Sequence, residues 1–434
     1  MSILNVNKIN PVGGGSTVTI AGIASVTNNI SVGNSVTAGS FVGPIEGDVT
    51  GNVTGNADTA SGLSGNPSIN TTGIVTATSF VSDTPLSHRN VIINGDAKIS
   101  QRATTQGSIT SGGYYAVDRW YVTMDTAGTW TMYQDADVPS GYGFSKSVSL
   151  DVNTANTSLS AGSRAMLSYR LEGQDVQRFC KGTANAKKYA LSFWVKCGKT
   201  GTYVLELFDH DNSRHICKTY TISSANTWEQ KKLIFDNETS NAFANDNGKS
   251  LELQFYLAAG SNFTSGTLAT SWASNTNANR AVGQVNVADS TSNKYFLTGV
   301  QLEVGPVVTP FEHRSFGDEL RRCQRYYQRW KGHSDHNGIG PGRGNGSSGV
   351  FVSVNLMQCL RATPSITNSG IVVFKAGASS TSTTNTPSLT NGSAFDDTSC
   401  IFPMNITGLS GISNNQGGYT VFLSSSDLRL DAEF

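Results

Sequence analysis

The chain has 434 residues, which is enough for two or three domains of ordinary size. Charged residues make up only 14%, and 31 Lys and Arg balance 31 Asp and Glu, so no general field draws the chain to nucleic acid or to an acidic membrane. We find no apolar run long enough to span a bilayer and no secretory leader, and we expect a soluble chain made in the cytosol.

Residues 1–86 differ in texture from the rest, because they contain no Cys, Trp or Tyr and only two aromatic residues, Phe41 and Phe80. The sequence of residues 35–42 returns in similar form at 74–81, and residues 47–56 repeat with a period of four. Val, Ile and Thr between Gly-Asn turns predict short strands whose small apolar faces need neighbours. We predict a repeat shaft in which Phe41 and Phe80 contact other copies of the chain; a flexible linker is the alternative.

Strands of ordinary globular type begin near Asn90. In residues 189–196 the apolar side chains fall on one face of the strand and the remainder on the other: Leu191, Phe193 and Val195 against Ser192, Trp194 and Lys196. Residues 203–208 and 251–257 alternate in the same way, and turns separate these runs. The pattern predicts an antiparallel β-sandwich within residues 87–316.

One helix is predicted after the sandwich, as a linking element at 317–330. Ser315 can cap it, and a single stripe would carry Phe316, Leu320, Cys323 and Tyr327. The Gly-rich stretch that follows is expected to be a flexible loop, and Pro341 argues against a phosphate cradle because it lacks an N–H donor. Strand-like runs at 350–354, 371–374 and 419–423 predict a C-terminal β domain over 331–434.

These features resemble phage tail-fibre proteins, especially those of cyanophages. The repeats at 47–56 and 74–81 look like shaft repeats of such fibres. Four segments are similar to a jelly-roll module of the carbohydrate-binding type: 90–96 (NVIINGD), 118–120 (DRW), 226–229 (NTWE) and 298–305 (TGVQLEVG). The sequence TPFEHRS at 309–315, followed by Glu319-Leu320 and CQRYY at 323–327, looks like the signature that closes this module in phage proteins.

The resemblance implies an all-β, intertwined homotrimer exposed on the virion. Its N-terminus would join tail or baseplate proteins, and its C-terminal β domain would be the candidate receptor-binding tip. A glycan or other receptor on the host surface would be the partner, with no nucleic acid and no membrane insertion. Two alternatives remain: a glycan-degrading tail spike and a purely structural fibre.

Candidate ligand-binding residues lie on the strand faces that point away from the core. An aromatic ring can stack on a sugar, while charged and amide groups can bond its hydroxyls. We therefore single out Trp194, Lys196, Glu206, Gln254 and Tyr256. The alternative is that Trp194 and Phe208 pack under a loop or against another copy of the chain.

The polar side of the predicted helix is strongly basic. We expect Arg321, Arg322 and Arg325 to contact acidic groups of a neighbouring copy or domain, although an anionic glycan or nucleic acid would also suit them. Asp118 and Arg119 are expected to form a structural ion pair.

Motifs for catalysis and metal binding are weak. The six cysteines show neither disulfide nor zinc spacing, and we expect reduced thiols. The residues 209–213 suit a hairpin turn better than a calcium loop, and His333, Asp335 and His336 suit a solvent-exposed loop. No nucleophile elbow, HExxH or P-loop is present. A glycosidase needs two carboxylates that converge on the bond, and the sequence alone does not show whether any two of the candidates do so: Asp396, Asp397, Glu206 and Glu252. We expect no enzyme activity, cofactor or metal.

Overall fold

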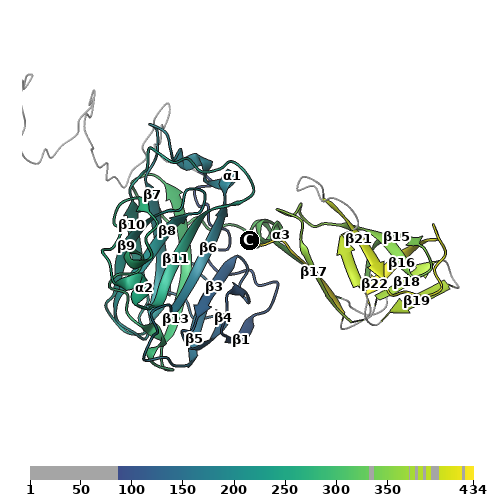
Figure 1. Ribbon diagram of the computed structural model, residues 1–434, viewed down its shortest axis with the longest axis horizontal. Helices are drawn as coiled ribbons and strands as arrows, with labels where there is room; N and C mark the ends of the chain where they lie inside the picture. The colour runs from purple at the N-terminus through teal and green to yellow at the C-terminus, as the bar shows by residue number, and fades with distance from the viewer. Residues whose placement is uncertain are drawn as a thin grey trace, which may run out of the picture. The chain divides into compact units, whose positions relative to one another are not determined.

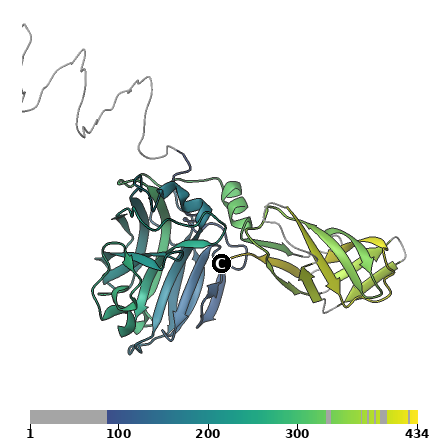
Figure 2. The same ribbon diagram turned by 45° about the horizontal axis from the view of Figure 1, so that its top comes forward.

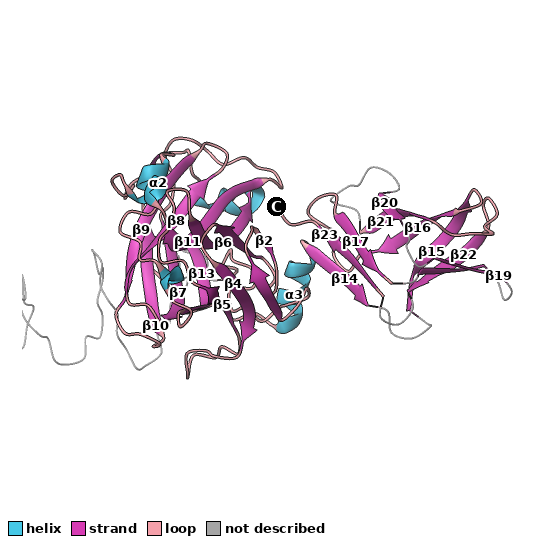
Figure 3. Ribbon diagram, turned by 60° about the horizontal axis from the view of Figure 1, so that its bottom comes forward, coloured by secondary structure: helices cyan, strands magenta, loops and turns pink. Residues whose placement is uncertain are grey.

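A computed structural model describes residues 87–331, 337–370, 372–376, 380–384, 388–391, 400–422 and 426–434. The predicted shaft at 1–86, with Phe41 and Phe80, lies outside the described residues, as do His333, Asp335, His336, Asp396 and Asp397. Antiparallel strands dominate the described part (Figures 1 and 3), which confirms the prediction of an all-β protein.

Two sheets form the sandwich. The six-stranded sheet has, in spatial order, β1 (Thr105–Ile109), β4 (Thr129–Asp135), β5 (Ser147–Thr154), β13 (Lys294–Val304), β7 (Tyr189–Cys197) and β10 (Glu229–Phe235). The seven-stranded sheet has β12 (Ala273–Ser274), β9 (Arg214–Ile222), β8 (Gly201–Asp209), β11 (Lys249–Ala259), β6 (Arg164–Glu172), β3 (Trp120–Asp125) and β2 (Gly113–Tyr114).

The core of the sandwich is made by alternate residues of both sheets. Leu191, Phe193 and Val195 of β7 are fully buried in it, as the alternation predicts, together with Leu205 of β8 and Leu253 of β11. Because side chains of a strand alternate between its two faces, Trp194 and Lys196 point to the outer face of the six-stranded sheet. The turn predicted at 209–213 is confirmed as the hairpin between β8 and β9.

Helices are short in the described part: α1 (Gly173–Val176), α2 (Ser261–Thr264), α3 (Phe316–Gln324) and the 3-10 turns η2 (Gln177–Phe179), η3 (Asn277–Asn279) and η4 (Val287–Asp289). The Ser315 hydroxyl accepts a hydrogen bond from the Asp318 N–H and caps α3, which is drawn as the coiled ribbon in Figure 2. The helix is shorter than expected, because Tyr327 already belongs to a strand. Of the predicted stripe, Cys323 is buried, but Phe316 is 61% exposed because it precedes the turn that contacts the core.

Two further sheets follow α3. One consists of β14 (Tyr327–Lys331), β23 (Asp427–Asp431) and β17 (Ser365–Ser369). The other consists of β19 (Ser380–Thr384), β18 (Val372–Ala376), β22 (Gly417–Phe422), β15 (Asn337–Asn345), β16 (Gly349–Asn355), β21 (Ile401–Thr407) and β20 (Ser388–Asn391).

The prediction of a flexible loop in the Gly-rich stretch is wrong, because β15 is a central strand between β16 and β22. Its glycines have a packing role. A Cβ on Gly340 would lie 2.1 Å from the Ser353 carbonyl oxygen, and one on Gly344 would lie 2.0 Å from that of Ser413. Neighbouring backbone therefore approaches too closely for any other residue.

Cys359 and Cys400 form a disulfide, with Cα atoms 4.5 Å apart, so the prediction of six reduced thiols is wrong for this pair. Asn355 pairs with Ile401 across β16 and β21, which brings the ends that carry the two cysteines together. The other four cysteines are free thiols.

The predicted Asp118–Arg119 ion pair is also wrong. Asp118 contacts Arg102, 3.7 Å away, and Arg119 pairs with Glu433, while its guanidinium carbon lies 3.3 Å from the ring centre of Tyr326. The two residues lie in a turn, where Arg119 has a φ of +72°, and each side chain has its partner elsewhere. Among the described helices, none is long and apolar enough to cross a membrane.

Candidate functional site

The outer face of the seven-stranded sheet is covered by the chain itself. Residues that follow β11 fold over it, and a second apolar cluster forms between sheet and cover: Met166, Val204, Cys217, Tyr256, Phe263, Ala269 and Ala281. Three of the predicted ligand-binding residues lie beneath this cover, since Glu206 and Tyr256 are fully buried and Gln254 is nearly so. Phe208 is also buried on this face, so the alternative expected for it, packing under a loop, is confirmed.

These buried polar groups satisfy one another. Arg280, from the cover, places its guanidinium 2.9 to 3.1 Å from both carboxylate oxygens of Glu206 and 2.7 Å from the amide oxygen of Gln254. The Tyr256 hydroxyl donates to Glu206 over 3.1 Å, and His215 Nδ1 lies 2.6 Å from the same carboxylate. Burial and the nearby charge of Glu206 raise the pKa of Tyr256 well above its ordinary value. We interpret this network as structural, because Arg280, Tyr256 and His215 engage the Glu206 carboxylate, and only His215 Nε2 lacks a partner among these groups.

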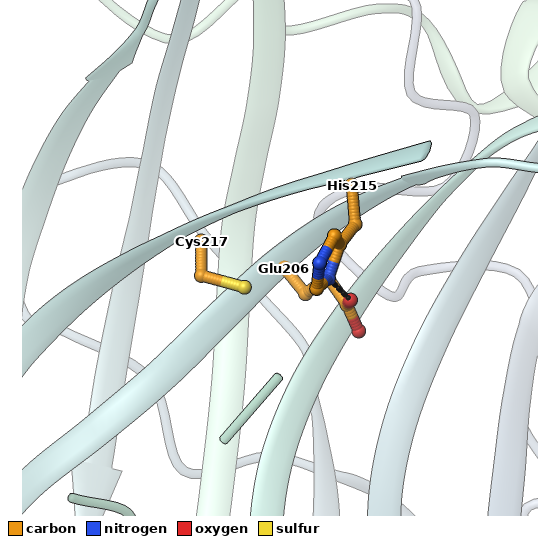
Figure 4. A group of neighbouring side chains, drawn as sticks. All are labelled: Glu206, His215 and Cys217. Atoms are coloured by element: carbon orange, nitrogen blue, oxygen red, sulfur yellow. Dashed lines mark hydrogen bonds and ion pairs between the residues drawn. The ribbon is translucent and has the colours of Figure 1, made fainter. Parts of the chain in front are cut away.

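Glu206, His215 and Cys217 bring possible metal-ligand atoms within 4.8 Å of one another (Figure 4). The chemistry does not fit a cation. The Arg280 guanidinium already occupies both oxygens of Glu206, and burial raises the pKa of the Cys217 thiol, so the thiolate that binds metals does not form. His215 Nε2 remains, and one nitrogen is too few for a metal centre.

The outer face of the six-stranded sheet carries a different kind of site, which we call the aromatic pocket. It is a cavity of about 390 Å³ beside Trp194 of β7. Its described lining combines four aromatic rings and one imidazole with amide, ammonium and backbone groups: Tyr142, Phe144, Trp194, Gln230, Lys232, Val308, Thr309, Pro310, Phe311 and His313. The rings of Tyr142 and Trp194 have centres 4.3 Å apart and make one wall. Trp194 is only 9% exposed, so it packs under this loop, as the alternative for Trp194 expects, and Tyr142 is the more accessible ring.

Two strands supply the floor of the aromatic pocket. Gln230 of β10 pairs directly with Trp194 of β7, so both side chains project from the same point of the outer face. Lys232 follows two residues along β10 and therefore points the same way. Since β10 is an edge strand, this floor is reached from the side as well as from above.

The loop between β4 and β5 brings Tyr142 and Phe144 over the floor. Asp137 anchors it, since its carboxylate accepts hydrogen bonds from Trp228 Nε1 at 2.9 Å and from the Lys196 ammonium. Burial works against the charged form, but these two donors outweigh it and lower the pKa of Asp137. Lys196, a predicted ligand-binding residue, is thus engaged by Asp137 and holds the loop.

Phe144 is seated by a glycine. Gly299 lies in an irregular part of β13 with a φ of +62°, and a Cβ there would be 2.6 Å from the Phe144 ring. The ring then meets Phe311, at 5.1 Å between centres, and the imidazole of His313, at 5.2 Å. These three rings form the second wall of the aromatic pocket.

The segment at 306–314, which we call the strap, supplies that wall. Glu303 of β13 accepts hydrogen bonds from the Thr309 N–H and hydroxyl, each at 2.7 Å, and Gln301 accepts from the Glu312 N–H at 2.8 Å. At its far end, Glu312 accepts the backbone N–H groups of Arg89 and Asn90. The strap covers residues 309–314 of the signature noted above, and it ties the end of the sandwich to its beginning.

The basic residues of α3 face a second cavity, of about 610 Å³, which we call the arginine pocket. Its described lining includes Arg314, Arg321, Arg322 and Arg325, with Glu312 and His313 of the strap. Arg325 forms a bidentate pair with Glu172, both contacts at 2.8 Å. Of the three arginines predicted to contact acidic groups, Arg325 does so within the chain.

The five predicted ligand-binding residues do not form one site. Trp194 lies in the aromatic pocket, Lys196 holds its loop, and Glu206, Gln254 and Tyr256 lie on the other sheet beneath a cover. Sequence reasoning missed Tyr142, Gln230 and Lys232. An aromatic residue between two glycines, as in Gly141-Tyr142-Gly143, marks an exposed turn and was the available signal.

No family model matches the chain, and no curated protein sequence is similar to it. Similar solved structures include bacteriophage CBA120 tailspike protein 4, enzymatically active domain, at 15% identity over 50% of this chain and 21% of that chain (TM-score 0.27). A putative sugar-binding protein from Bacteroides thetaiotaomicron matches at 12% identity over 50% and 100% of the two chains (TM-score 0.29). A family 11 carbohydrate-binding module of a Clostridium thermocellum cellulase matches at 11% over 48% and 98% (TM-score 0.24). The chain spans about a fifth of the tailspike's length.

Proposed function

We propose that the chain is a non-enzymatic fibre protein of a phage virion, of the cyanophage type, that adheres to a glycan on the host surface through the aromatic pocket. The observation that carries the proposal is the pairing of the Trp194 and Tyr142 rings in a cavity that also contains the exposed side chains of Gln230 and Lys232. Aromatic rings present flat apolar surfaces to the C–H faces of sugars, while amide and ammonium groups bond the hydroxyls.

The size of the aromatic pocket supports a ligand of a few sugar units. Its volume of about 390 Å³ lies at the lower end of the range typical of small-molecule sites. With only the described residues considered, the Tyr142 side chain is 54% exposed, so a ligand can contact its ring. An open pocket at a sheet edge suits a polymer that extends beyond it on either side.

Binding without cleavage is the mechanism that we propose. Glycoside hydrolysis requires two carboxyl groups on either side of the bond. The described residues that line the aromatic pocket include no Asp or Glu. A glycan-degrading tail spike would release reducing sugars from host envelope polysaccharide, and detection of such release by the purified protein would overturn this part of the proposal.

The fibre architecture rests on the repeats at 1–86, which lack the aromatic residues for a core of their own. We propose that copies of the chain supply it to one another as a homotrimer, with the N-terminus joined to tail or baseplate proteins. Light scattering of the full chain at micromolar concentration is expected to give the mass of a trimer. A monomer would contradict the fibre proposal.

The binding site is tested with a matched set of aromatic substitutions. We expect Trp194→Ala and Tyr142→Ala each to weaken binding of the full chain to host-envelope polysaccharide by roughly 30-fold, as expected when a central aromatic contact is removed. Tyr419→Ala is the control, since Tyr419 of β22 is 49% exposed and lies outside the aromatic pocket. If only Tyr419→Ala weakens binding, the C-terminal sheet makes the contact, as first predicted from its position, and the proposed site is wrong.

A further inference from the structure

We infer that the ligand is an acidic polysaccharide, whose sugar rings lie in the aromatic pocket and whose anionic groups reach the arginine pocket. The inference rests on the proposed function and names the class of its ligand.

The two pockets share a wall. His313 lines both of them, and the strap that carries it supplies Pro310 and Phe311 to the aromatic pocket and Glu312 and Arg314 to the arginine pocket. A polymer seated against Trp194 therefore needs only to pass His313 to meet α3. The two cavities, of about 390 and 610 Å³, thus both border His313 and the strap, and we propose that one polymer occupies both as a track.

Cations without partners lie along this track. Arg314 is engaged by Glu312, and Arg325 by Glu172. By contrast, the side chains of Arg321 and Arg322 form no ion pair or hydrogen bond within the described part of the chain, although both line the arginine pocket. Lys232, at the other end of the track, is likewise unengaged by described residues and is exposed. A guanidinium forms charge-assisted, often bidentate, bonds with carboxylates and sulfates.

Acidic groups of the arginine pocket are mostly engaged. Glu312 accepts two backbone N–H groups and the Arg314 guanidinium, and Asp318 accepts the Ser315 hydroxyl at 2.7 Å. Asp175 has no hydrogen bond or ion pair among the described residues and faces the same cavity. The carboxylate of Asp175 therefore opposes an anionic ligand, which gives a variant that should strengthen binding.

The test compares two polymers that differ only in charge. Polygalacturonate and its methyl-esterified form have the same backbone, but esterification removes the negative carboxylates. We expect the full chain to bind polygalacturonate at least about tenfold more tightly, with a preference that shrinks as salt is added. Dextran sulfate and dextran form a second pair, which shows whether sulfate can replace carboxylate.

Substitutions then locate the preference. The double variant Arg321→Gln with Arg322→Gln should lose most of the preference for the charged polymer, with Lys232 keeping a small remainder. Asp175→Asn should bind polygalacturonate about threefold more tightly. The control, Lys187→Gln with Lys218→Gln, removes the same charge from side chains that line neither pocket, and it should keep the preference.

The outcomes separate this inference from the proposed function. Equal binding of charged and neutral polymers by the unaltered chain, no binding to any of the four, or a preference that is undiminished after loss of Arg321 and Arg322 overturns the inference. If Trp194→Ala still removes binding to the esterified polymer, the proposed function stands. If Trp194→Ala binds as the unaltered chain does, the proposed function is wrong, whatever the effect of charge.

Discussion

The outer faces of the two sheets carry similar polar and aromatic side chains, but other segments of the chain cover them to different extents. On the seven-stranded sheet, residues 261–281 cover the face, and Arg280 and Tyr256 both form hydrogen bonds with Glu206. On the six-stranded sheet, the loop with Tyr142 and the strap cover much of β7 and β13, so that Trp194 is only 9% exposed. Gln230 and Lys232 of the edge strand β10 stay exposed beside them. An outward-facing polar or aromatic residue is therefore available for binding only where no later segment of the chain folds over it.

The largest effect is expected when a buried charge on the outer face of the seven-stranded sheet loses its partner. Arg280→Met leaves the Glu206 carboxylate without its counter-ion, which should lower the free energy of unfolding by about 3–5 kcal/mol. Glycan binding by the molecules that remain folded should stay within about twofold. Chemical denaturation measures the first quantity, and the double variant Glu206→Gln with Arg280→Met should recover much of the loss.

Acid should also act mainly on the covered side. Burial alone would raise the pKa of Glu252 on β11, but the hydrogen bond from His210 and the charge of Arg170 outweigh it and lower it from 4.5 to about 2. Because the folded pKa is depressed, this stabilisation is complete above pH 4.5 and is lost as the pH falls toward 2, by up to about 3 kcal/mol. Denaturation curves of Glu252→Gln should lack this share of the pH dependence. Equal acid sensitivity of both proteins would contradict the assignment.

On the outer face of the six-stranded sheet, a change of shape should affect binding as well as stability. Gly299→Ala places a methyl group against the Phe144 ring and strains a left-handed φ, which should cost about 1–3 kcal/mol and displace one wall of the aromatic pocket. We expect glycan affinity to fall by about tenfold. Gly317→Ala is the control, since a Cβ there meets nothing within 4 Å.

The smallest effect separates the two faces most cleanly. Tyr256→Phe removes only the hydroxyl that bonds Glu206 and should lower the free energy of unfolding by about 1 kcal/mol. Binding should not change, since the Tyr256 ring lies on the covered face. A clear loss of glycan affinity in this variant would restore Tyr256 as a ligand-binding residue. It would also contradict the assignment of binding to the six-stranded sheet alone.

Local patterns predicted local structure well. The alternation around Phe193 placed Trp194 on an outer face, and Ser315 with Asp318 marked the start of α3, because both signals lie within a few residues. Alternation does not tell which sheet a strand joins, so Trp194 and Tyr256 were grouped although they lie on different sheets.

What the sequence did not reveal depends on contacts between distant residues. Arg119 finds Glu433, 314 positions away, and Cys359 finds Cys400 only because β16 and β21 pair. The glycines of β15 suggested a loop. They are needed because the backbone of neighbouring strands lies too close for a Cβ, and the sequence does not show that contact. The aromatic pocket likewise needs a loop and the strap to meet over β7, which no local pattern states.

The strap also determines where a pull along the chain is carried. The chain enters the sandwich at Asn90 and leaves it at Glu312, and these two points are hydrogen-bonded to each other. Arg314 adds bonds to the carbonyls of Asn90 and Ile92. A pull between these two ends therefore acts first on this short bridge of hydrogen bonds. In the fibre that we propose, the wall of the aromatic pocket would be built on the same segment that resists such a pull.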